Sequence, residues 1–312
     1  MDRFYDKVGA SAKLEEIAAA RRKALTSRKD AVIVHLADIE LQDVKVQQLI
    51  QGRRNWRLCI PDEDGEVNDE LVVRLQGIMF KNGLVPRNVQ ACAANKAHLL
   101  TQHIEICGLD TATFTDSVAK LHTVHERFAQ QLAGVEVAPI VDRDVVSTDK
   151  FVASNRIFSL KSDVPNEQDN MFEDGVDAAG LLKKIQPTDF IHAPENIVKY
   201  FRARAKAEGG TSYLPFYPGG FQVGDIVELQ VSFVAMATAK SKVKITTRLQ
   251  AVTLLDSEYS MEASLARSAA ALNNPINAAI RRKVGYFLED EEEAEHKAKR
   301  ARTGSPEEGL SS

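Results

Sequence analysis

The chain has 312 residues, of which 44% are hydrophobic, and its formal net charge at neutral pH is −4. This length and composition suit one large domain or two modest ones, and the near-neutral charge means that any nucleic-acid surface must be local. The three cysteines, Cys59, Cys92 and Cys107, are too few for a disulfide framework and fit a reducing compartment. Residues 1–6 lack a signal-peptide pattern, and no apolar run reaches the roughly 18–20 residues of a membrane span. We therefore expect an intracellular protein that does not enter a membrane.

Most of the first 134 residues have the spacing and composition of α-helices. Ser11 is a suitable N-cap for a segment rich in Ala, Leu, Glu, Lys and Arg. Along 68–81 the apolar residues recur near a spacing of 3.6, as Leu71, Val72, Leu75, Ile78 and Met79. The predicted helices are 11–28, 31–51, 68–81, 87–107 and 115–132. The second of these stays open between helix and strand, because Val32–Val34 suits either structure.

Valine and isoleucine become frequent after Gly134, which predicts a β-rich domain over 135–257. Its clearest part is 222–256, where two runs alternate strictly between apolar and polar side chains around a turn at 239–242. This alternation predicts a long antiparallel hairpin with one buried face. A hairpin alone is marginally stable, so we expect it to belong to a larger sheet or to pack on helices.

The C-terminal part predicts a helical extension over 258–288, interrupted at Asn273–Pro275, and a disordered charged tail over 289–312. Together with the mainly helical region at 1–134, these patterns predict an α+β protein. Its N-terminal half is expected to be helical and its C-terminal half β-rich.

One segment of the predicted hairpin carries a resemblance. The stretch Phe221–Asp256, and more weakly Arg281–Tyr286, resembles a segment found in many proteins predicted from mushroom-forming fungi. The resemblance implies a eukaryotic, multicopy family. It implies no catalytic residues, because no function is assigned to that family.

The polar face of the predicted hairpin is a candidate nucleic-acid surface. Gly224–Val227 before a long strand is similar to the opening of an OB-type strand. Basic residues on and after the turn share the polar side, namely Lys240, Lys242, Lys244 and Arg248. Aromatic residues that would supply stacking lie in the preceding loop, namely Tyr213, Phe216 and Tyr217. The alternative is a solvated, lysine-rich turn that protects the hairpin, with the aromatic residues forming a hydrophobic plug.

A helix-turn-helix is a second candidate. Leu71–Lys81 would be its first helix, Asn82–Pro86 its turn, and Arg87 the start of its second helix. Basic and amide residues near that start suit DNA, namely Arg87, Asn88, Gln90, Asn95 and Lys96. The same geometry is common in helical bundles that do not bind DNA.

Metal and catalytic motifs are weak. Cysteines and histidines gather as Cys92, His98, His103, Cys107, His122 and His125. If the first four lie on one helix, their spacing does not converge on a tetrahedral site, so we predict no metal site. The chain lacks the GxSxG, GxxxxGK[ST], HExxH and GxGxxG motifs, so no cofactor is predicted and an enzyme is disfavoured without being excluded.

The charged tail contains two basic clusters of the kind that nuclear-import receptors bind, which favours a nuclear location. They comprise Arg281, Arg282, Lys283, Lys297, Lys299, Arg300 and Arg302. The alternative is a solvated mixed-charge tail, because the acidic run Glu289–Glu295 lies between the clusters.

The sequence therefore predicts a non-enzymatic, intracellular and nuclear protein that acts by binding. A protein-interaction or scaffold module is the leading hypothesis. A nucleic-acid-binding protein, using the hairpin surface or the helix-turn-helix, is the alternative.

Overall fold

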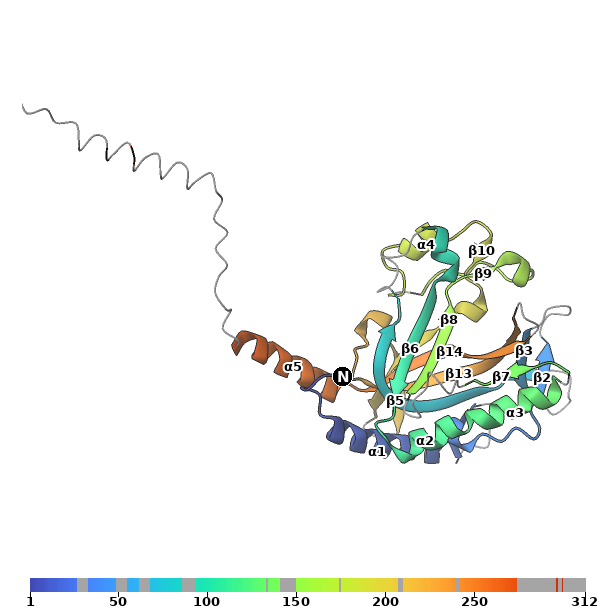
Figure 1. Ribbon diagram of the computed structural model, residues 1–312, viewed down its shortest axis with the longest axis horizontal. Coiled ribbons are helices and arrows are strands. Elements are labelled where there is room, and N and C mark those ends of the chain that lie inside the picture. Colours follow the sequence, from blue (N-terminus) through green and yellow to red (C-terminus); the bar gives the residue numbers. More distant parts are fainter. Residues whose placement is uncertain are drawn as a thin grey trace, which may run out of the picture. The chain divides into compact units, whose positions relative to one another are not determined.

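The computed structural model divides the chain into two compact units, Met1–Ala266 and Arg267–Ser312. The first unit contains the β-sheet and the start of helix α5 (Glu258–Asn273) (Figure 1). The residues that the structure describes are 1–26, 33–48, 55–61, 68–85, 94–132, 134–140, 150–173, 175–206, 210–238, 242–273, 296 and 299.

Five strands form a closed ring at the centre of the first unit. They are β5 (Val72–Gly83), β6 (Thr101–Cys107), β8 (Lys150–Arg156), β13 (Ile226–Ala237) and β14 (Val243–Asp256). β5 pairs antiparallel with β6 and with β13, β6 pairs antiparallel with β8, and β13 pairs antiparallel with β14. β8 runs parallel to β14, and this pairing closes the ring. This connectivity is that of the OB-fold, a five-stranded Greek-key barrel.

The barrel closes because β5 bends between two partners. Its residues 73–78 pair with β13, whereas residues 78–83 pair with β6. The change of partner coincides with a register shift between Met79 and Lys81, and such bulges bend a strand and increase its twist. Gly77 allows the close approach of β6, since a Cβ at this position would lie 2.8 Å from the Ile106 side chain.

Further elements extend this ring. Three strands continue the sheet beyond β5 and β3 (Asn55–Pro61), namely β1 (Ile33–His35), β2 (Lys45–Gln48) and β4 (Asn68–Glu70). β3 itself pairs with the end of β13. β7 (Val137–Ala138), β11 (Lys199–Ala205) and β12 (Thr211–Pro215) continue it beyond β14.

The connection 157–225, between β8 and β13, carries small elements of its own. It contains the two-stranded sheet of β9 (Ser159–Leu160) and β10 (Phe190–Ile191) and the short helix α4 (Leu181–Ile185). Three 3-10 turns lie beside them, namely η3 (Lys161–Asp163), η4 (Pro194–Asn196) and η5 (Pro218–Gly220). Two more occur earlier in the chain, η1 (Leu36–Asp38) and η2 (Ala94–Leu99).

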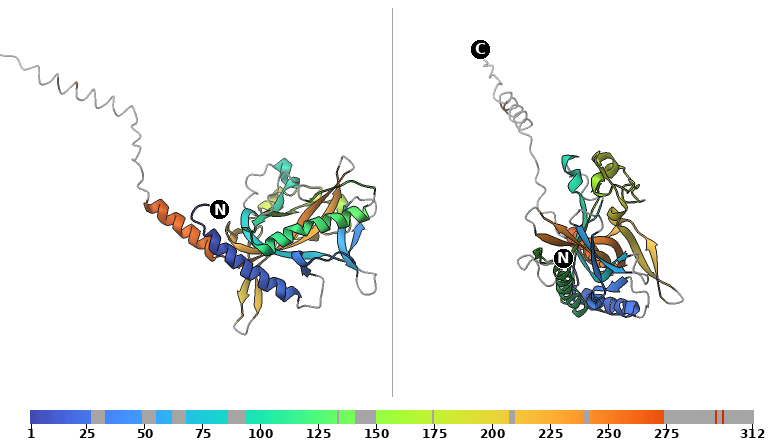
Figure 2. Two further views of the ribbon diagram at one scale, coloured as in Figure 1. Left: turned by 60° about the horizontal axis from the view of Figure 1, so that its bottom comes forward. Right: turned by 90° about the vertical axis from the view of Figure 1, so that its right-hand side faces the viewer.

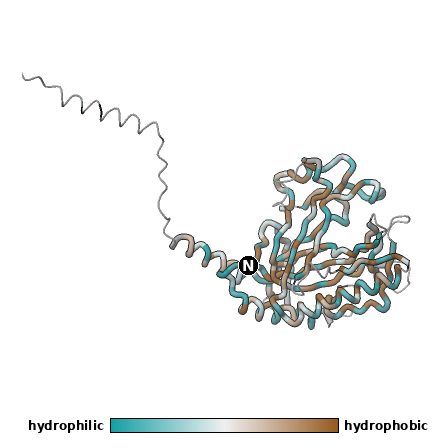
Figure 3. Tube along the Cα trace, in the orientation of Figure 1, coloured by the Kyte–Doolittle hydropathy of each residue, from teal (hydrophilic) through white to brown (hydrophobic). Residues whose placement is uncertain are grey.

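Helices α1 (Lys7–Thr26), α2 (Ala112–Ala119) and α3 (Leu121–Gln131) lie along one side of the sheet (Figures 1 and 2). The inward face of α3 joins the main core through Val124 and Phe128. The hydropathy of the strands alternates along the trace, which follows the alternation between core and solvent (Figure 3). Within the described residues, no helix combines the length and the apolar character that crossing a bilayer requires.

The predicted helical N-terminal half is wrong. Residues 31–51 contain β1, η1 and β2, residues 68–81 lie in β4 and β5, and residues 87–107 end in η2 and β6. The helix predicted at 11–28 corresponds to α1, and that at 115–132 corresponds to α2 and α3. The α+β class with helices gathered in the first half is therefore replaced by a fold dominated by one large mixed sheet.

The wrong prediction of a helix where β5 lies has a physical cause. Ile78 packs in an outer cluster with Tyr5 and Leu14, whereas its neighbour Met79 packs in the main core. Both faces of β5 are thus buried at this point, so the strand loses the alternation of a half-exposed strand. Its adjacent apolar residues then resemble the stripe of an amphipathic helix.

The predicted antiparallel hairpin is confirmed, but its single buried face is not, because Glu228, Ser232 and Val234 on the other side of β13 are buried as well. Residues 226–237 pair antiparallel with 243–256, and Val231, Phe233 and Leu249 are fully buried on its inner side. The barrel draws its strands from both sides of residue 134. Helix α5 occupies the first part of the predicted extension, whereas nearly all of the predicted tail lies outside the described residues.

Candidate functional site: a polar cavity on the outer face of the barrel

A cavity of about 300 Å³ lies on the outer face of the barrel. Its walls come from β3, β6, β8, β13 and β14 and from the connection 157–225. Thr101 at one side is the first residue of β6, and Met236 at another is the residue before the last of β13. The cavity thus lies beside the second and third strands of the barrel.

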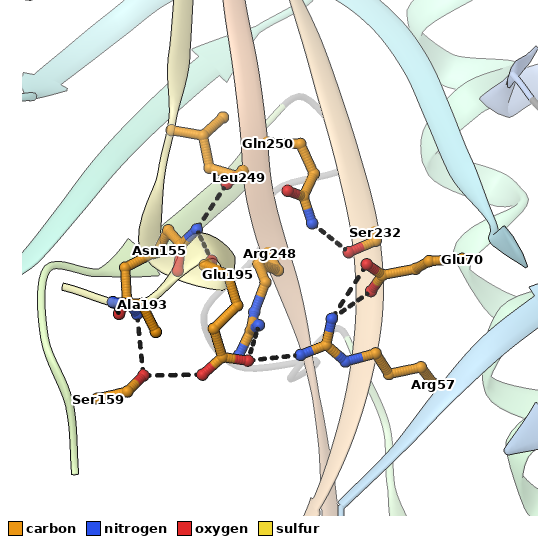
Figure 4. A network of polar contacts seen from close by, with 11 residues as sticks. Arg57, Glu70, Asn155, Ser159, Ala193, Glu195, Ser232, Arg248, Leu249 and Gln250 are labelled. Carbon is orange, nitrogen blue, oxygen red and sulfur yellow. Dashed lines mark hydrogen bonds and ion pairs between the residues drawn. The ribbon is translucent and has the colours of Figure 1, made fainter. Parts of the chain in front are cut away.

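Ion pairs hold one side of this cavity together (Figure 4). Nη2 of Arg57 on β3 and Nη1 of Arg248 on β14 each lie 2.8 Å from Oε2 of Glu195 on η4. Nη1 of Arg57 also lies 3.0 Å from both carboxylate oxygens of Glu70 on β4. Ser159 donates to the other oxygen of Glu195 at 2.7 Å. Glu195 therefore joins two barrel-side arginines to the connection 157–225.

The electrostatics of Glu195 follow from these partners. Burial opposes the ionisation of the carboxyl group, but Arg248, Ser159 and Arg57 outweigh burial and hold the pKa of Glu195 at about 2. Burial, together with the charge of Arg57, lowers the pKa of Arg248. Glu195 is consequently ionised at neutral pH, and it compensates much of the positive charge of the two arginines.

Three side chains at the cavity leave hydrogen-bonding atoms without a partner. Asn155 donates its amide to the carbonyl oxygens of Glu195 and Leu249, but its buried Oδ1 accepts nothing. Nε of Arg57 and Oδ1 of Asn55 are also buried without a partner. An unsatisfied buried polar atom costs roughly 1–3 kcal/mol, so these three atoms, which have almost no accessible surface, are a local cost to stability in the wall beside the cavity.

A row of outward-facing residues crosses four strands next to the cavity. His103 on β6 pairs in register with Ser154 on β8, which pairs with Arg248 on β14, which pairs with Ser232 on β13. The His103 ring lies over Gly83, where a side chain would overlap it. Ser232 at the end of the row is fully buried, so the accessible part of the row combines the His103 ring with the Ser154 hydroxyl and the Arg248 guanidinium.

Two exposed cations flank this row. Arg156 lines the cavity two residues beyond Ser154. Lys244 lies opposite Met236 in the register, on the same face of β14 as Arg248. Within the described part of the chain, neither Arg156 nor Lys244 forms an ion pair. Both cations are therefore free to meet an external anion.

The basic residues predicted on the hairpin are only partly gathered at this site. Arg248 lines the cavity and Lys244 flanks it, whereas Lys242 pairs with Glu136 at the hairpin tip. Lys240 lies outside the described residues.

The predicted stacking residues lie elsewhere. Tyr213 on β12 accepts a hydrogen bond from Arg21 of α1, 2.9 Å away. Phe216 packs edge-on against Phe221, with ring centroids 5.1 Å apart, and the exposed Tyr217 stacks beside Phe216. Among the described residues that line the cavity, none is aromatic.

The helix-turn-helix prediction is wrong, because Leu71–Lys81 forms β5 instead of a helix. Arg87, Asn88 and Gln90 lie outside the described residues, and Asn95 and Lys96 belong to η2. His103 and Cys107 lie on β6, and His122 and His125 on α3. No group of three or more potential metal ligands occurs among the described residues, which do not include Cys92.

Comparisons with known proteins give little guidance. No protein-family model matches the chain, and no curated protein matches it. Among solved structures, it is similar to gp2.5, a single-stranded DNA-binding protein encoded by bacteriophage T7. The TM-score is 0.32 and the identity 12%, over 68% of this chain and 98% of that one. At this TM-score the similarity carries no weight for the function of this chain.

Sequence reasoning misses the positions of Arg57, Asn155 and Glu195 at the cavity and of His103 in the row beside it. The sequence does hold one signal for Arg57. A charged residue between Trp56 and Leu58 in an extended segment is unusual, because charged side chains are rarely buried without a partner, and Arg57 is buried. Glu195 and Asn155 carry no comparable local signal. Their positions at the site follow from the connection 157–225 folding back on the barrel.

Proposed function

We propose that this protein binds single-stranded nucleic acid on the outer face of the barrel, without catalysis. In OB-folds, oligonucleotides bind across the second and third strands, between the loops that join strands 1 and 2 and strands 4 and 5. The same fold hosts many functions, so the proposal depends on side chains rather than on the barrel. The observation that carries it is the row from His103 to Arg248, flanked by the unpaired Arg156 and Lys244.

Each part of this surface suits a part of the ligand. Arg156 and Lys244 would contact backbone phosphates, because phosphates supply most of the affinity and basic side chains neutralise them. The His103 ring would support a base, since imidazole rings are among the side chains on which unpaired bases stack. Val152 on β8, which is 51% exposed, extends this surface with an apolar patch beside Glu105 in the register.

The test is the salt dependence of binding to an oligo(dT) of about 12 nucleotides, because one OB-fold covers roughly 4–16. Fluorescence anisotropy would give the dissociation constant between about 50 and 200 mM salt, where phosphate contacts have large effects. The Arg156→Ala, Lys244→Ala double variant should bind more weakly. Its slope of log affinity against log salt should be shallower by about 1.4, at roughly 0.7 per lost phosphate contact.

Lys7→Ala is the matched control, because Lys7 is an exposed lysine at the start of α1, far along the chain from the cavity-lining strands. It should leave both the affinity and the slope unchanged. Absence of binding at the lowest salt, or a double variant with an unaltered slope, would overturn the proposal.

The protein-interaction or scaffold hypothesis stays a prediction, since no described feature specifies a protein partner. The nuclear location also stays a prediction, because of the seven basic tail residues only Lys299 lies within the described part of the chain. Deleting 281–302 and imaging a tagged copy tests it. An unchanged distribution between nucleus and cytoplasm would refute nuclear import through this segment.

A further inference from the structure

The ribbon formed by β11 and β12 extends beyond the rest of the sheet. β11 pairs with β14 from Lys199 to Arg202, whereas its antiparallel pairing with β12 continues to Ala205. Lys206 then donates its backbone N–H to the carbonyl oxygen of Gly210, 3.1 Å away. Figure 2 shows this ribbon, in gold, standing away from the other strands. Beyond Arg202 the ribbon is therefore an arm of two strands, with no third strand among the described residues.

Three cations share one face of this arm. Because successive residues of a strand point to opposite faces, Arg202, Arg204 and Lys206 lie on the same side. Tyr213 of β12 lies on the other side, since it pairs with the residue between the two arginines, and its hydroxyl group lies 2.9 Å from Nη2 of Arg21 on α1. The basic face thus points away from α1. All three cations are exposed, and within the described part of the chain none of them forms an ion pair.

We infer that this basic face, defined by Arg202, Arg204 and Lys206, binds double-stranded DNA with the ribbon seated in the major groove. The major groove of B-form DNA is about 12 Å wide and admits a two-stranded β-ribbon. The major groove of an RNA duplex is deep and too narrow for side chains to read. The inference goes beyond the proposed function, because it assigns a second site with a different nucleic acid.

The spacing of the cations suits the phosphates of a duplex. Residues two apart in a strand are separated by roughly 6.8 Å, so the row from Arg202 to Lys206 covers roughly 14 Å. Phosphates of one strand follow at about 3.4 Å along the duplex axis, so the row covers about four base pairs. Phosphate contacts supply essentially all of the affinity in binding that is independent of base sequence. We therefore expect duplexes of different sequence to bind alike.

The chemistry of this face favours a duplex over a single strand. Its other described members are Ser212 and Leu214, which pair with the two arginines, so the face holds no aromatic side chain among the described residues. Surfaces for single strands use aromatic rings on which unpaired bases stack. The bases of a duplex already stack on one another and need no such rings. Leu214 is 45% exposed and suits contact with a thymine methyl group in the major groove.

The arm and the surface proposed for single strands lie at different places along β14. The last pair of β11 with β14 joins Arg202 to Leu254, whereas Ser154 of the row beside the cavity pairs with Arg248. The six positions from Arg248 to Leu254 cover about 20 Å of strand. Substitutions in the arm therefore leave the residues of the other surface unchanged.

The experiment measures, by fluorescence anisotropy, how the full chain binds a DNA duplex of about 20 base pairs between about 50 and 200 mM salt. The variant is Arg204→Ala combined with Lys206→Ala, because both positions lie beyond the pairing with β14. It should bind the duplex more weakly. Its slope of log affinity against log salt should be shallower by about 1.8, at roughly 0.9 per lost phosphate contact. Its affinity for oligo(dT) should stay unchanged.

Two control variants separate charge from position. Arg204→Lys combined with Lys206→Arg keeps both charges on the arm and should keep the slope. Lys45→Ala combined with Lys184→Ala removes two exposed lysines, one from β2 at the other end of the strand order and one from α4. This variant should also keep the slope. If the double alanine variant does not fold, an RNA duplex of the same sequence still tests the groove on the natural chain, which should bind it more weakly than DNA.

The outcomes distinguish this inference from the proposed function. No duplex binding at the lowest salt, or an unaltered slope in the double alanine variant, would refute the duplex site. RNA and DNA duplexes bound equally well would refute the seating in the major groove. An equal loss of affinity for duplex and oligo(dT) would make the arm part of one shared surface, which would also refute a separate site. Duplex binding that depends on the arm, without any binding of oligo(dT), would support the duplex site and refute the proposed function alone.

Discussion

Arg57 and Glu195 are 138 positions apart in the chain, yet Nη2 of Arg57 lies 2.8 Å from Oε2 of Glu195. The pair ties β3, at one margin of the sheet, to the connection that follows β8. The Arg57 side chain is 7% exposed and that of Glu195 is 26% exposed. Removal of either partner would leave a largely desolvated charge with one partner fewer, because Arg57 would keep only Glu70 and Glu195 only Arg248, which makes the pair structurally important as well as central to the cavity.

Glu195→Gln is expected to have opposite effects on stability and binding. The amide keeps the size of the side chain but loses the charge that compensates Arg57 and Arg248, so the free energy of unfolding should fall by roughly 2–3 kcal/mol. Arg248 then loses its carboxylate partner and Arg57 keeps only Glu70, so the two arginines should attract the phosphate backbone more strongly. Affinity for oligo(dT) should rise while the melting temperature falls. Weaker binding at unchanged stability would contradict this account of Glu195.

The acid sensitivity of the protein should depend on the same carboxylate. The pKa of Glu195 falls from 4.5 to about 2 on folding, so ionised Glu195 stabilises the fold above pH 4.5. That contribution should disappear as the pH falls from about 4.5 to 2, and it is on the order of 3 kcal/mol. Denaturant titrations at a series of pH values should show this loss. In Glu195→Gln the same acid range should produce a smaller change in unfolding free energy.

The sequence predicts strands whose core face is marked by alternating apolar residues, even where the other face is also buried, as it is at Glu228 and Ser232 of β13. Alternate residues of β13 from Val227 to Ala235 belong to the main core, and this alternation is visible in the order of the amino acids. β5 gives no such pattern, because Ile78 and Met79 are buried on opposite faces and the alternation vanishes. Which strands close the ring also depends on pairings between distant segments, which local patterns do not encode.

The candidate site is less predictable than the fold. Lys244 and Arg248 can be identified because they share the polar face of one strand. Arg57, Asn155 and Glu195 converge only after three separate segments have folded, so their spacing in the chain carries no signal. Tyr213 precedes the hairpin in the sequence, but this does not place it at the cavity. Its hydroxyl group accepts a hydrogen bond from Arg21 of α1 instead.

Arg21→Ala should destabilise the protein far more than Arg22→Ala. Arg21 bonds to Glu228, whose side chain is 1% exposed, whereas Arg22 pairs with Asp38 at a site where both side chains are about one-third exposed. Loss of Arg21 leaves a buried carboxylate without its main partner, which costs roughly 3–5 kcal/mol. Loss of the more exposed pair costs roughly 0–1 kcal/mol. Urea denaturation of the two variants gives the comparison directly.

A second variant isolates the charge of Glu228. Arg21→Ala combined with Glu228→Gln should recover part of the lost stability, because the fully buried carboxylate is then gone and only the more distant Arg74, 3.7 Å from Glu228, loses an ion-pair partner. A double variant as unstable as the sum of its single variants would show that Arg21 acts through packing against α1 and Tyr213 instead.

Gly83→Ala should displace the His103 ring and so test the surface role of that ring. A methyl group on Gly83 would overlap the imidazole, so the ring must move or the strands must separate. Such overpacking typically costs about 1–3 kcal/mol. His103→Ala in the same chain removes the obstruction, and the double-mutant cycle should show a coupling of roughly 0.5–3 kcal/mol. Oligo(dT) binding should weaken in all three variants, because none retains the ring in its place over residue 83. Additive stabilities in the cycle, or full affinity in His103→Ala, would remove His103 from the binding surface.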